Sequence, residues 1–184
     1  MKAYTFSSQA IKHTGFSLVE LLMAVTIASV LLSITISNLS PLSQKSRKYD
    51  YMTQLHSHLI AARSFAINNA DFISICPHIN YQCVDSWTND IMMFVDSNKD
   101  ITRSQNELVI ADLTSPEGGD SLRYSRRGLT FTPSGGIVGF ANGSFLYCSE
   151  NSSLNQPAVR ISVANSGRVR LKEDSDKCKQ SNQG

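Results

Sequence analysis

The sequence predicts an α+β protein in which one long N-terminal helix packs on an antiparallel β-sheet or sandwich. Three observations support this fold class. An apolar run occupies residues 16–36, an amphipathic segment follows it, and from Asp71 onward short segments rich in β-branched and aromatic residues alternate with turn signals. The 184 residues suffice for one domain with a hydrophobic core.

The apolar run FSLVELLMAVTIASVLLSITI forms the first half of the predicted helix, and Glu20 is its only charged residue. At helical rise it reaches about 30 Å, the thickness of a hydrocarbon core. Lys2 and Lys12 precede it and indicate a cytoplasmic N-terminus. We therefore expect a transmembrane helix over residues 16–40 and an exported domain over residues 41–184.

Glu20 is unusual because a carboxylate at membrane depth costs free energy unless it has a partner. It follows Phe16 by one helical turn, so a position near the hydrated interface is an alternative to a functional role.

The second half of the helix is predicted over residues 42–68, with Asn68-Asn69 as the stop. Its apolar residues recur at spacings of three and four, which marks one buried face: Met52, Leu55, Leu59, Ala62 and Ala66.

Six β-strands are expected next, and Asn142-Gly143 indicates a two-residue hairpin between the last two, with Phe140 opposite Phe145. The expected strands cover residues 72–76, 91–95, 108–113, 129–132, 136–141 and 144–149.

The segment AVRISVANSGRVRLK predicts a final hairpin with a three-residue turn and Gly167 in the left-handed position. This register pairs Val163 with Val169, and Ile161 with Leu171, on one face. A two-residue turn would instead pair Val163 with an arginine. The other face then carries Arg160, Ser162, Ala164, Arg168, Arg170 and Lys172.

Arg160 would lie opposite Lys172, and like charges paired across strands are destabilising unless something neutralises them. Either the face is solvated, with Glu173, Asp174 and Asp176 as counterions, or it binds a polyanion. Residues 71–120 carry two basic and nine acidic residues, whereas residues 121–170 carry six arginines and one acid. An arginine-rich face favours sequence-independent binding to phosphates.

Four cysteines in an exported domain favour two disulfides, for which three connectivities are possible. We favour Cys76–Cys83, which closes a short loop, and Cys148–Cys178, which ties the C-terminal segment to a strand. The chain has no C-x-x-C pair, so a metal site at these cysteines is disfavoured.

Residues 96–107 match the ligand spacing of a calcium-binding EF-hand loop, but Ile101 stands where that loop needs glycine, and the flanks are predicted strands. We expect an acidic hairpin loop. His56 and His58 point to different helix faces, and no catalytic motif occurs. We expect no enzymatic activity, no metal and no cofactor.

The stretch KHTGFSLVELL resembles the class III signal of type IV pilins and pseudopilins. The resemblance implies that a prepilin peptidase cuts after Gly15, removing residues 1–15, and methylates Phe16. It also implies that Glu20 pairs with the N-terminal amine of a neighbouring subunit. Many pilins carry a proline midway along this helix, whereas here Pro41 comes late, so a kink would be placed differently.

RSFAINN at the helix end, the FVDSNKD loop and SGRVRL before the last cysteine resemble the GspH/FimT branch of this superfamily. FimT-type minor pilins are linked to DNA uptake in natural transformation through a Gly-Arg-x-Arg motif, which corresponds here to Gly167, Arg168 and Arg170. The implied partners are double-stranded DNA, other pilins, the prepilin peptidase and, before assembly, the inner membrane of a Gram-negative bacterium. Residues expected to enlarge the DNA site are Lys172, Arg160, Lys177 and Lys179.

Two alternatives stay open: a GspH-type pseudopilin of type II secretion, and an adhesive or priming minor pilin without a DNA role. The sequence does not decide whether Arg126 and Arg127 join the basic patch.

Overall fold

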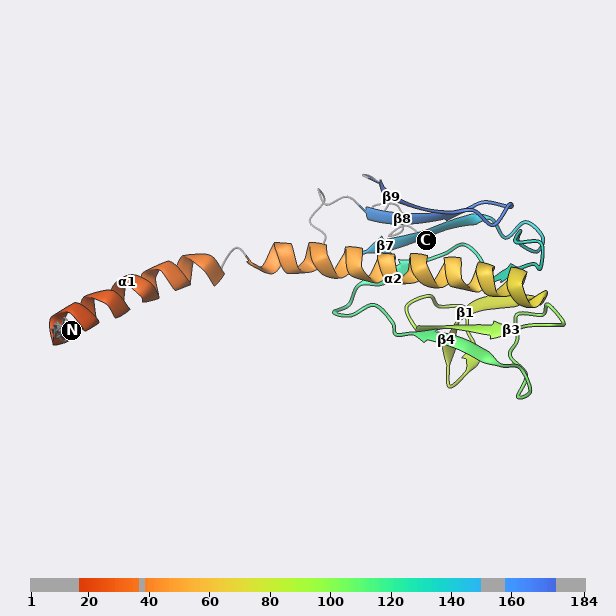
Figure 1. Cartoon of the computed structure of the whole chain (residues 1–184), viewed down its shortest axis with the longest axis horizontal. Helices are drawn as coiled ribbons and strands as arrows, with labels where there is room; N and C mark the ends of the chain where they lie inside the picture. Colours follow the sequence, from red (N-terminus) through yellow and green to blue (C-terminus); the bar gives the residue numbers. More distant parts are fainter. Residues whose placement is uncertain (1–16, 37–38, 150–157, 175–184) are drawn as a thin grey trace, which may run out of the picture. The chain divides into compact units, whose positions relative to one another are not determined.

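The computed structural model describes residues 17–36, 39–149 and 158–174 (Figure 1). The chain divides into two compact units, Met1–Ser43 and Gln44–Gly184.

The first helix, α1 (Leu18–Ile36), begins at a capping sequence. The Ser17 hydroxyl accepts a hydrogen bond from the Glu20 N–H at 3.3 Å, and the Ser17 carbonyl accepts one from the Leu21 N–H at 3.1 Å. The spacing Ser-x-x-Glu is that of a capping box, and a carboxylate in the first turn also complements the helix dipole. Glu20 therefore fits the helix start locally, whatever its role in assembly.

The large apolar side chains described along α1 are exposed in the isolated chain, as for Leu18, which is 75% exposed. The run thus forms a helix where the sequence predicted one. Within the described residues, none of the helices reaches the length and apolarity needed to span a bilayer.

The second helix, α2 (Leu39–Asn69), covers the predicted segment and begins three residues earlier. Pro41 lies in its first turn, where a missing N–H costs no intrahelical hydrogen bond. The helix ends in a Schellman motif, because Ala70 has a positive φ of 54° and the Asp71 N–H donates to the Ala66 carbonyl at 3.2 Å. The predicted stop at Asn68-Asn69 is correct to within one residue.

Two antiparallel sheets follow. The first has the order β2-β1-β3-β4, and β6 pairs with β1 as well. The second has the order β5-β7-β8-β9. The first sheet contains β1 (Ile73–Ile79), β2 (Gln82–Cys83), β3 (Asp90–Val95), β4 (Val109–Leu113) and β6 (Leu129–Phe131), and the second contains β5 (Ser121–Arg123), β7 (Gly143–Cys148), β8 (Ala158–Val163) and β9 (Val169–Asp174).

The apolar face of α2 packs against both sheets, which lie on either side of it in Figure 1. The five predicted core positions of this helix are all at most 2% exposed. They share one buried cluster with Ile73 and Ile75 of β1, Phe145 of β7 and Ile161 of β8. Since both sheets depend on one helix face for burial, they form one structural unit with it.

The predicted strand over residues 136–141 is wrong. Apart from an isolated bridge between Phe131 and Ile137, this segment has no strand pairing, and Phe140 is 83% exposed. Phe145 lies opposite Ile161 rather than Phe140. The reason is that β5 and β8 occupy both edges of β7, which leaves no edge for the expected hairpin. Strands β2 and β5 were not predicted, because two or three residues are too few to show a period.

Candidate nucleic-acid interface

The hairpin of β8 and β9 has the predicted register, with Val163 opposite Val169 and Arg160 opposite Lys172. Its turn is closed by two backbone hydrogen bonds, from the Ala164 N–H to the Arg168 carbonyl at 3.0 Å and from the Gly167 N–H to the Ala164 carbonyl at 2.8 Å. Gly167 has a φ of 71°, as the three-residue turn requires.

Gly167 is also required for a second reason, which the sequence did not indicate. A Cβ atom at this position would lie 1.9 Å from the carbonyl oxygen of Gly135 and 2.9 Å from Nε of Arg63. The turn is therefore in direct backbone contact with the segment that follows β6, and a side chain does not fit there.

Arg63, on α2, holds this contact together. Its Nε donates to the Gly135 carbonyl at 2.7 Å, and Nη2 lies 3.5 Å from the Ser166 carbonyl. The Ile137 N–H donates to the Asn165 carbonyl at 3.1 Å. The turn is thus fixed to the helix and to the segment after β6. Sequence reasoning gave Arg63 no role of its own, although it is the first residue of the RSFAINN stretch that carries the family resemblance.

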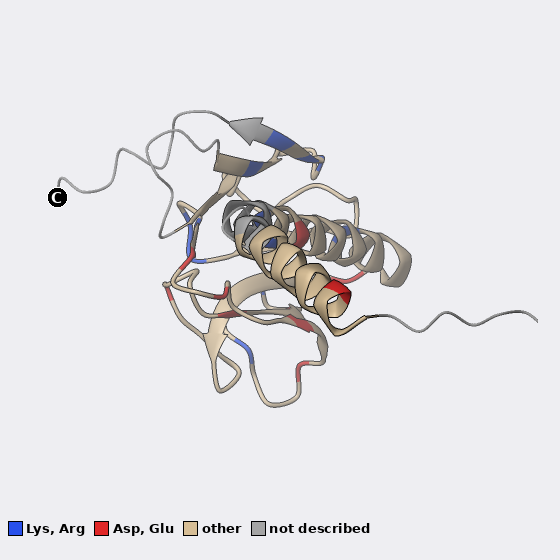
Figure 2. Cartoon of the chain, turned by 90° about the vertical axis from the view of Figure 1, so that its left-hand side faces the viewer, with Lys and Arg blue, Asp and Glu red and all other residues tan. Residues whose placement is uncertain are grey.

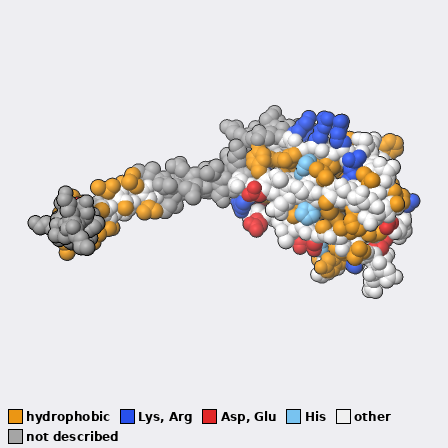
Figure 3. Space-filling view, in the orientation of Figure 1, with side chains coloured by type: hydrophobic (Ala, Val, Ile, Leu, Met, Phe, Trp, Pro, Cys, Tyr) orange, Lys and Arg blue, Asp and Glu red, His pale blue; other side chains and the backbone are white. Residues whose placement is uncertain are grey.

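The basic side chains project from this fixed turn and its outer strand. Arg168, Arg170 and Lys172 are exposed, and Arg160 is half-buried. Figure 3 shows a group of basic side chains over β8 and β9. Acidic residues gather mainly around the first sheet in Figure 2, as the uneven charge along the sequence indicated. The hairpin therefore presents fixed cations to solvent on one face.

Arg126 and Arg127 lie elsewhere, in the loop after β5. With Phe140 they line an open hollow of about 330 Å³. Nε of Arg127 is 3.7 Å from Oδ1 of Asp85, and the Arg126 carbonyl accepts a hydrogen bond from the Trp87 indole at 2.7 Å. Neither arginine belongs to the strand positions that carry the basic face of the hairpin.

Several predicted site residues lie outside the described residues: Gly15, Phe16, Lys177, Lys179 and Cys178. The Cys148–Cys178 pairing consequently stays a prediction, as do the processing site and the contribution of the two lysines. The assembly role of Glu20 also stays a prediction.

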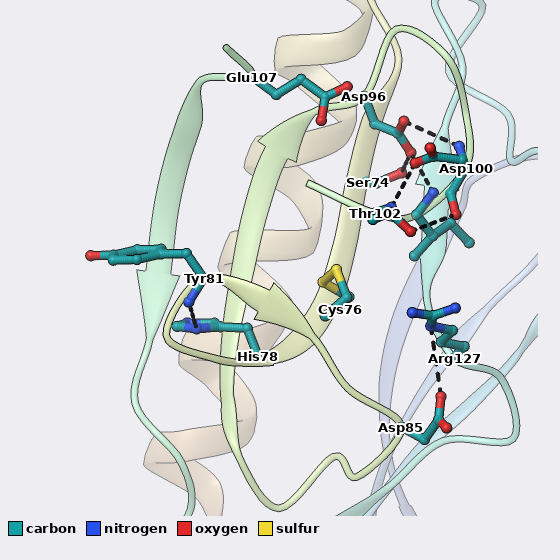
Figure 4. Close-up of a disulfide and its surroundings, with 12 residues drawn as sticks. Ser74, Cys76, His78, Tyr81, Asp85, Asp96, Asp100, Thr102, Glu107 and Arg127 are labelled. Carbon is teal, nitrogen blue, oxygen red and sulfur yellow. Dashed lines mark hydrogen bonds and ion pairs between the residues drawn. A yellow bond between two sulfur atoms is a disulfide. The ribbon is translucent and has the colours of Figure 1, made fainter. Parts of the chain in front are cut away.

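Cys76 and Cys83 are joined by a disulfide that links β1 to β2, with their Cα atoms 5.7 Å apart (Figure 4). His78, which the sequence placed between them, uses both ring nitrogens. Nδ1 accepts the Tyr81 N–H at 3.2 Å, so Nε2 carries the proton and donates to Asp112 at 2.9 Å. This histidine therefore supports the hairpin and offers no free nitrogen to a metal.

The acidic loop after β3 is held by Asp96, which is fully buried. Its Oδ1 accepts the Lys99 N–H at 2.9 Å, and its Oδ2 accepts the Ile101 N–H at 3.1 Å and a short hydrogen bond from the Ser74 hydroxyl (Figure 4). Both carboxylate oxygens thus cap backbone amides of the loop. Among the described residues, no group of three or more potential metal ligands comes together.

The long helix packed on two antiparallel sheets, together with the N-terminal motif, defines a type IV pilin-like protein. The chain belongs to the family of the type II transport protein GspH, whose model matches residues 52–167. Residues 12–36 match the prokaryotic N-terminal methylation motif. The pilin-like assignment and the α+β fold class predicted from the sequence are confirmed.

Solved structures agree with this fold. The chain is similar to the type IV minor pilin FimU of Pseudomonas aeruginosa, with 18% identity, a TM-score of 0.56, and coverage of 72% of this chain and 92% of FimU. It is also similar to the minor pseudopilin EpsH from the type 2 secretion system of Vibrio cholerae, with 11% identity, a TM-score of 0.51, and coverage of 69% and 97%. A comparison with curated proteins finds no match.

Proposed function

We propose that this protein is a minor type IV pilin that binds extracellular double-stranded DNA without sequence preference for uptake in natural transformation. The observation that carries the proposal is the fixed turn at Gly167, from which Arg168 and Arg170 project into solvent. Lys172 follows Arg170 on the same face of β9, two residues further from the turn, and it lies opposite Arg160 of β8.

Phosphate binding suits this geometry. Guanidinium groups bind phosphate oxygens through paired N–H donors, and a rigid backbone reduces the ordering cost of binding. Neutralising three phosphates would give a slope of log K against log salt of about −2.7. A single small site of this kind binds weakly, so avidity among pilus subunits is needed to hold DNA.

Assembly follows from the N-terminal motif. Its match implies processing by a prepilin peptidase and association with other pilins. We propose cleavage after Gly15, methylation of Phe16 and pairing of Glu20 with the amine of a neighbouring subunit. The protein would be held at the inner membrane before it joins a pilus at the cell surface. Its role is structural and DNA-binding, without enzymatic activity.

The second candidate is a GspH-type pseudopilin of type II secretion. The family match and the likeness to EpsH favour it. In this case the basic face of the hairpin is solvated or contacts a neighbouring subunit. A priming minor pilin without DNA binding gives the same expectation for the hairpin.

A DNA-binding titration of the purified full chain in detergent tests the proposal. A fluorescently labelled duplex is titrated at several salt concentrations, with the wild type, an Arg168→Gln/Arg170→Gln variant and an Arg126→Gln/Arg127→Gln variant. Both variants lose two positive charges, so any difference between them reflects the position of the charges and not their number. We expect the hairpin variant to lose binding and the Arg126→Gln/Arg127→Gln variant to keep it. Absence of salt-dependent binding in the wild type, or equal binding by both variants, refutes the proposal.

Deletion of the gene distinguishes a role in DNA uptake from a role in type II secretion in the cell. The DNA-uptake function predicts loss of transformation with protein secretion intact, whereas a pseudopilin role predicts the reverse.

A further inference from the structure

The pairing of strands carries a row of side chains across the whole second sheet. Arg123 of β5 lies opposite Leu146 of β7, Leu146 opposite Arg160 of β8, and Arg160 opposite Lys172 of β9. Residues directly opposite each other in antiparallel strands project from the same face of a sheet. Three basic residues from three strands therefore stand in one line.

The burial of the neighbouring positions shows which face this is. Leu122, Tyr147 and Val159 form the adjacent row and are at most 2% exposed, because they point into the core. Side chains alternate along a strand, so the row of Arg123 points outward. Arg123 itself is exposed. It lies on β5, which is one edge strand of the sheet, whereas β9 is the other edge strand.

A second outward row lies nearer the turn and consists of Ser144, Ser162 and Arg170. All charged residues in these two rows are basic. Asp174, which the sequence suggested as a counterion, pairs with Ala158 in a row further from the turn. The outer face near the turn therefore combines cations at both edges with hydroxyl donors in the middle.

The width of the sheet matches a feature of duplex DNA. Neighbouring strands lie about 4.8 Å apart, so three intervals separate Arg123 from Lys172 by about 14 Å. The major groove of B-DNA is about 12 Å wide, with a phosphate backbone along each side. Extended arginine and lysine side chains easily cover the difference.

We propose that the outer face of the second sheet spans a groove of duplex DNA, with Arg123 on one phosphate backbone and Arg170 and Lys172 on the other. This inference rests on the proposed function and names the form of DNA that the site selects. A single strand presents one backbone and can be held by β9 alone. Arg123 is thus the residue that favours duplex over single-stranded DNA.

The test compares labelled duplex and single-stranded DNA of equal length, titrated with the full chain in detergent over a range of salt. Arg123→Gln should weaken duplex binding and reduce the magnitude of its salt slope by about 0.9, the value for one phosphate, while single-strand binding stays unchanged. Arg170→Gln should weaken both. Arg123→Lys keeps the charge and should retain the duplex preference. This result would show that the weaker duplex binding of Arg123→Gln is due to the lost charge and not to a folding defect.

Arg126→Gln is the matched control, since Arg126 is exposed and lies three residues from Arg123 but outside both rows. Equal losses for Arg123→Gln and Arg126→Gln, or equal losses on the two forms of DNA, overturn the groove-spanning geometry. If Arg123→Gln has no effect while Arg168→Gln/Arg170→Gln abolishes binding, this inference fails and the proposed function stands. A wild-type chain that binds neither form refutes the proposed function itself.

Discussion

Replacing Gly167 by alanine tests the idea that the basic turn is fixed by backbone contact. The added Cβ would lie 1.9 Å from the Gly135 carbonyl oxygen and 2.9 Å from Nε of Arg63. Because one of these atoms belongs to the backbone, the turn itself must move away. The hydrogen bond from Arg63 to Gly135 is then weakened as well.

The expected destabilisation has two parts. A non-glycine residue at the observed φ of 71° costs about 1–2 kcal/mol. Relief of the overlap with Gly135 adds about 1–3 kcal/mol, the usual cost of overpacking. The free energy of unfolding should therefore fall by roughly 2–5 kcal/mol, which is a large part of the stability of an ordinary domain.

Gly139→Ala separates the two parts. Gly139 has a φ of 63°, close to that of Gly167, but no described heavy atom beyond its chain neighbours lies within 4 Å of the position of its Cβ. Urea denaturation of both variants, followed by far-UV circular dichroism, measures the difference. Gly139→Ala should show the conformational cost alone, and Gly167→Ala should exceed it by the packing cost.

Equal destabilisation in the two glycine variants would refute the packing argument. It would mean that the turn moves away from Gly135 at no cost, and that Arg168 and Arg170 stand on a flexible support. DNA binding offers a second measurement, since a displaced turn should weaken binding in Gly167→Ala and leave it unchanged in Gly139→Ala.

Four further predictions concern other contacts. Arg63→Met should lower the free energy of unfolding by about 1–3 kcal/mol, because the Gly135 carbonyl loses a charged donor, and urea melts against an Ile60→Ala control on the exposed side of α2 measure this. A Cys76→Ser/Cys83→Ser variant should lose about 2.5 kcal/mol, the closure entropy for a sequence separation of 7, and an unchanged denaturation midpoint would contradict it. Burial raises the pKa of Tyr124 to about 12, against the opposing effect of Arg126, so its stabilising contribution is complete below pH 10 and is lost as pH rises toward 12. Tyr124→Phe should flatten that alkaline decline in denaturant melts. Glu20→Gln should block incorporation into pili, and normal incorporation in isolated fibres would count against the pairing role.

Local patterns in the sequence were enough to predict most of the elements. The spacing from Met52 to Ala66 identified the buried face of α2, and the alternation around Val163 and Val169 selected the hairpin register. Both predictions are confirmed because each depends on residues close together in the chain, where side-chain period and backbone geometry are directly linked.

The failed prediction of a hairpin at Asn142-Gly143 shows where local reasoning stops. The dipeptide is a strong turn signal, yet β7 pairs with β5 and β8. Which edges meet depends on competition among all strands for a position over the helix, and no short window contains that information. Strand β5, with three residues, had no periodic signal at all.

The sequence by itself therefore determined the pilin-like class, the helix faces and the register that puts Arg168 and Arg170 outside. Only the tertiary structure placed Arg63 and Gly135 against Gly167, and only the pairing of four strands aligned Arg123 with Lys172. The physical reason is the same in both cases. Contacts between distant segments arise when separate elements bury their apolar faces together, so residues without a local pattern of their own become neighbours in the fold.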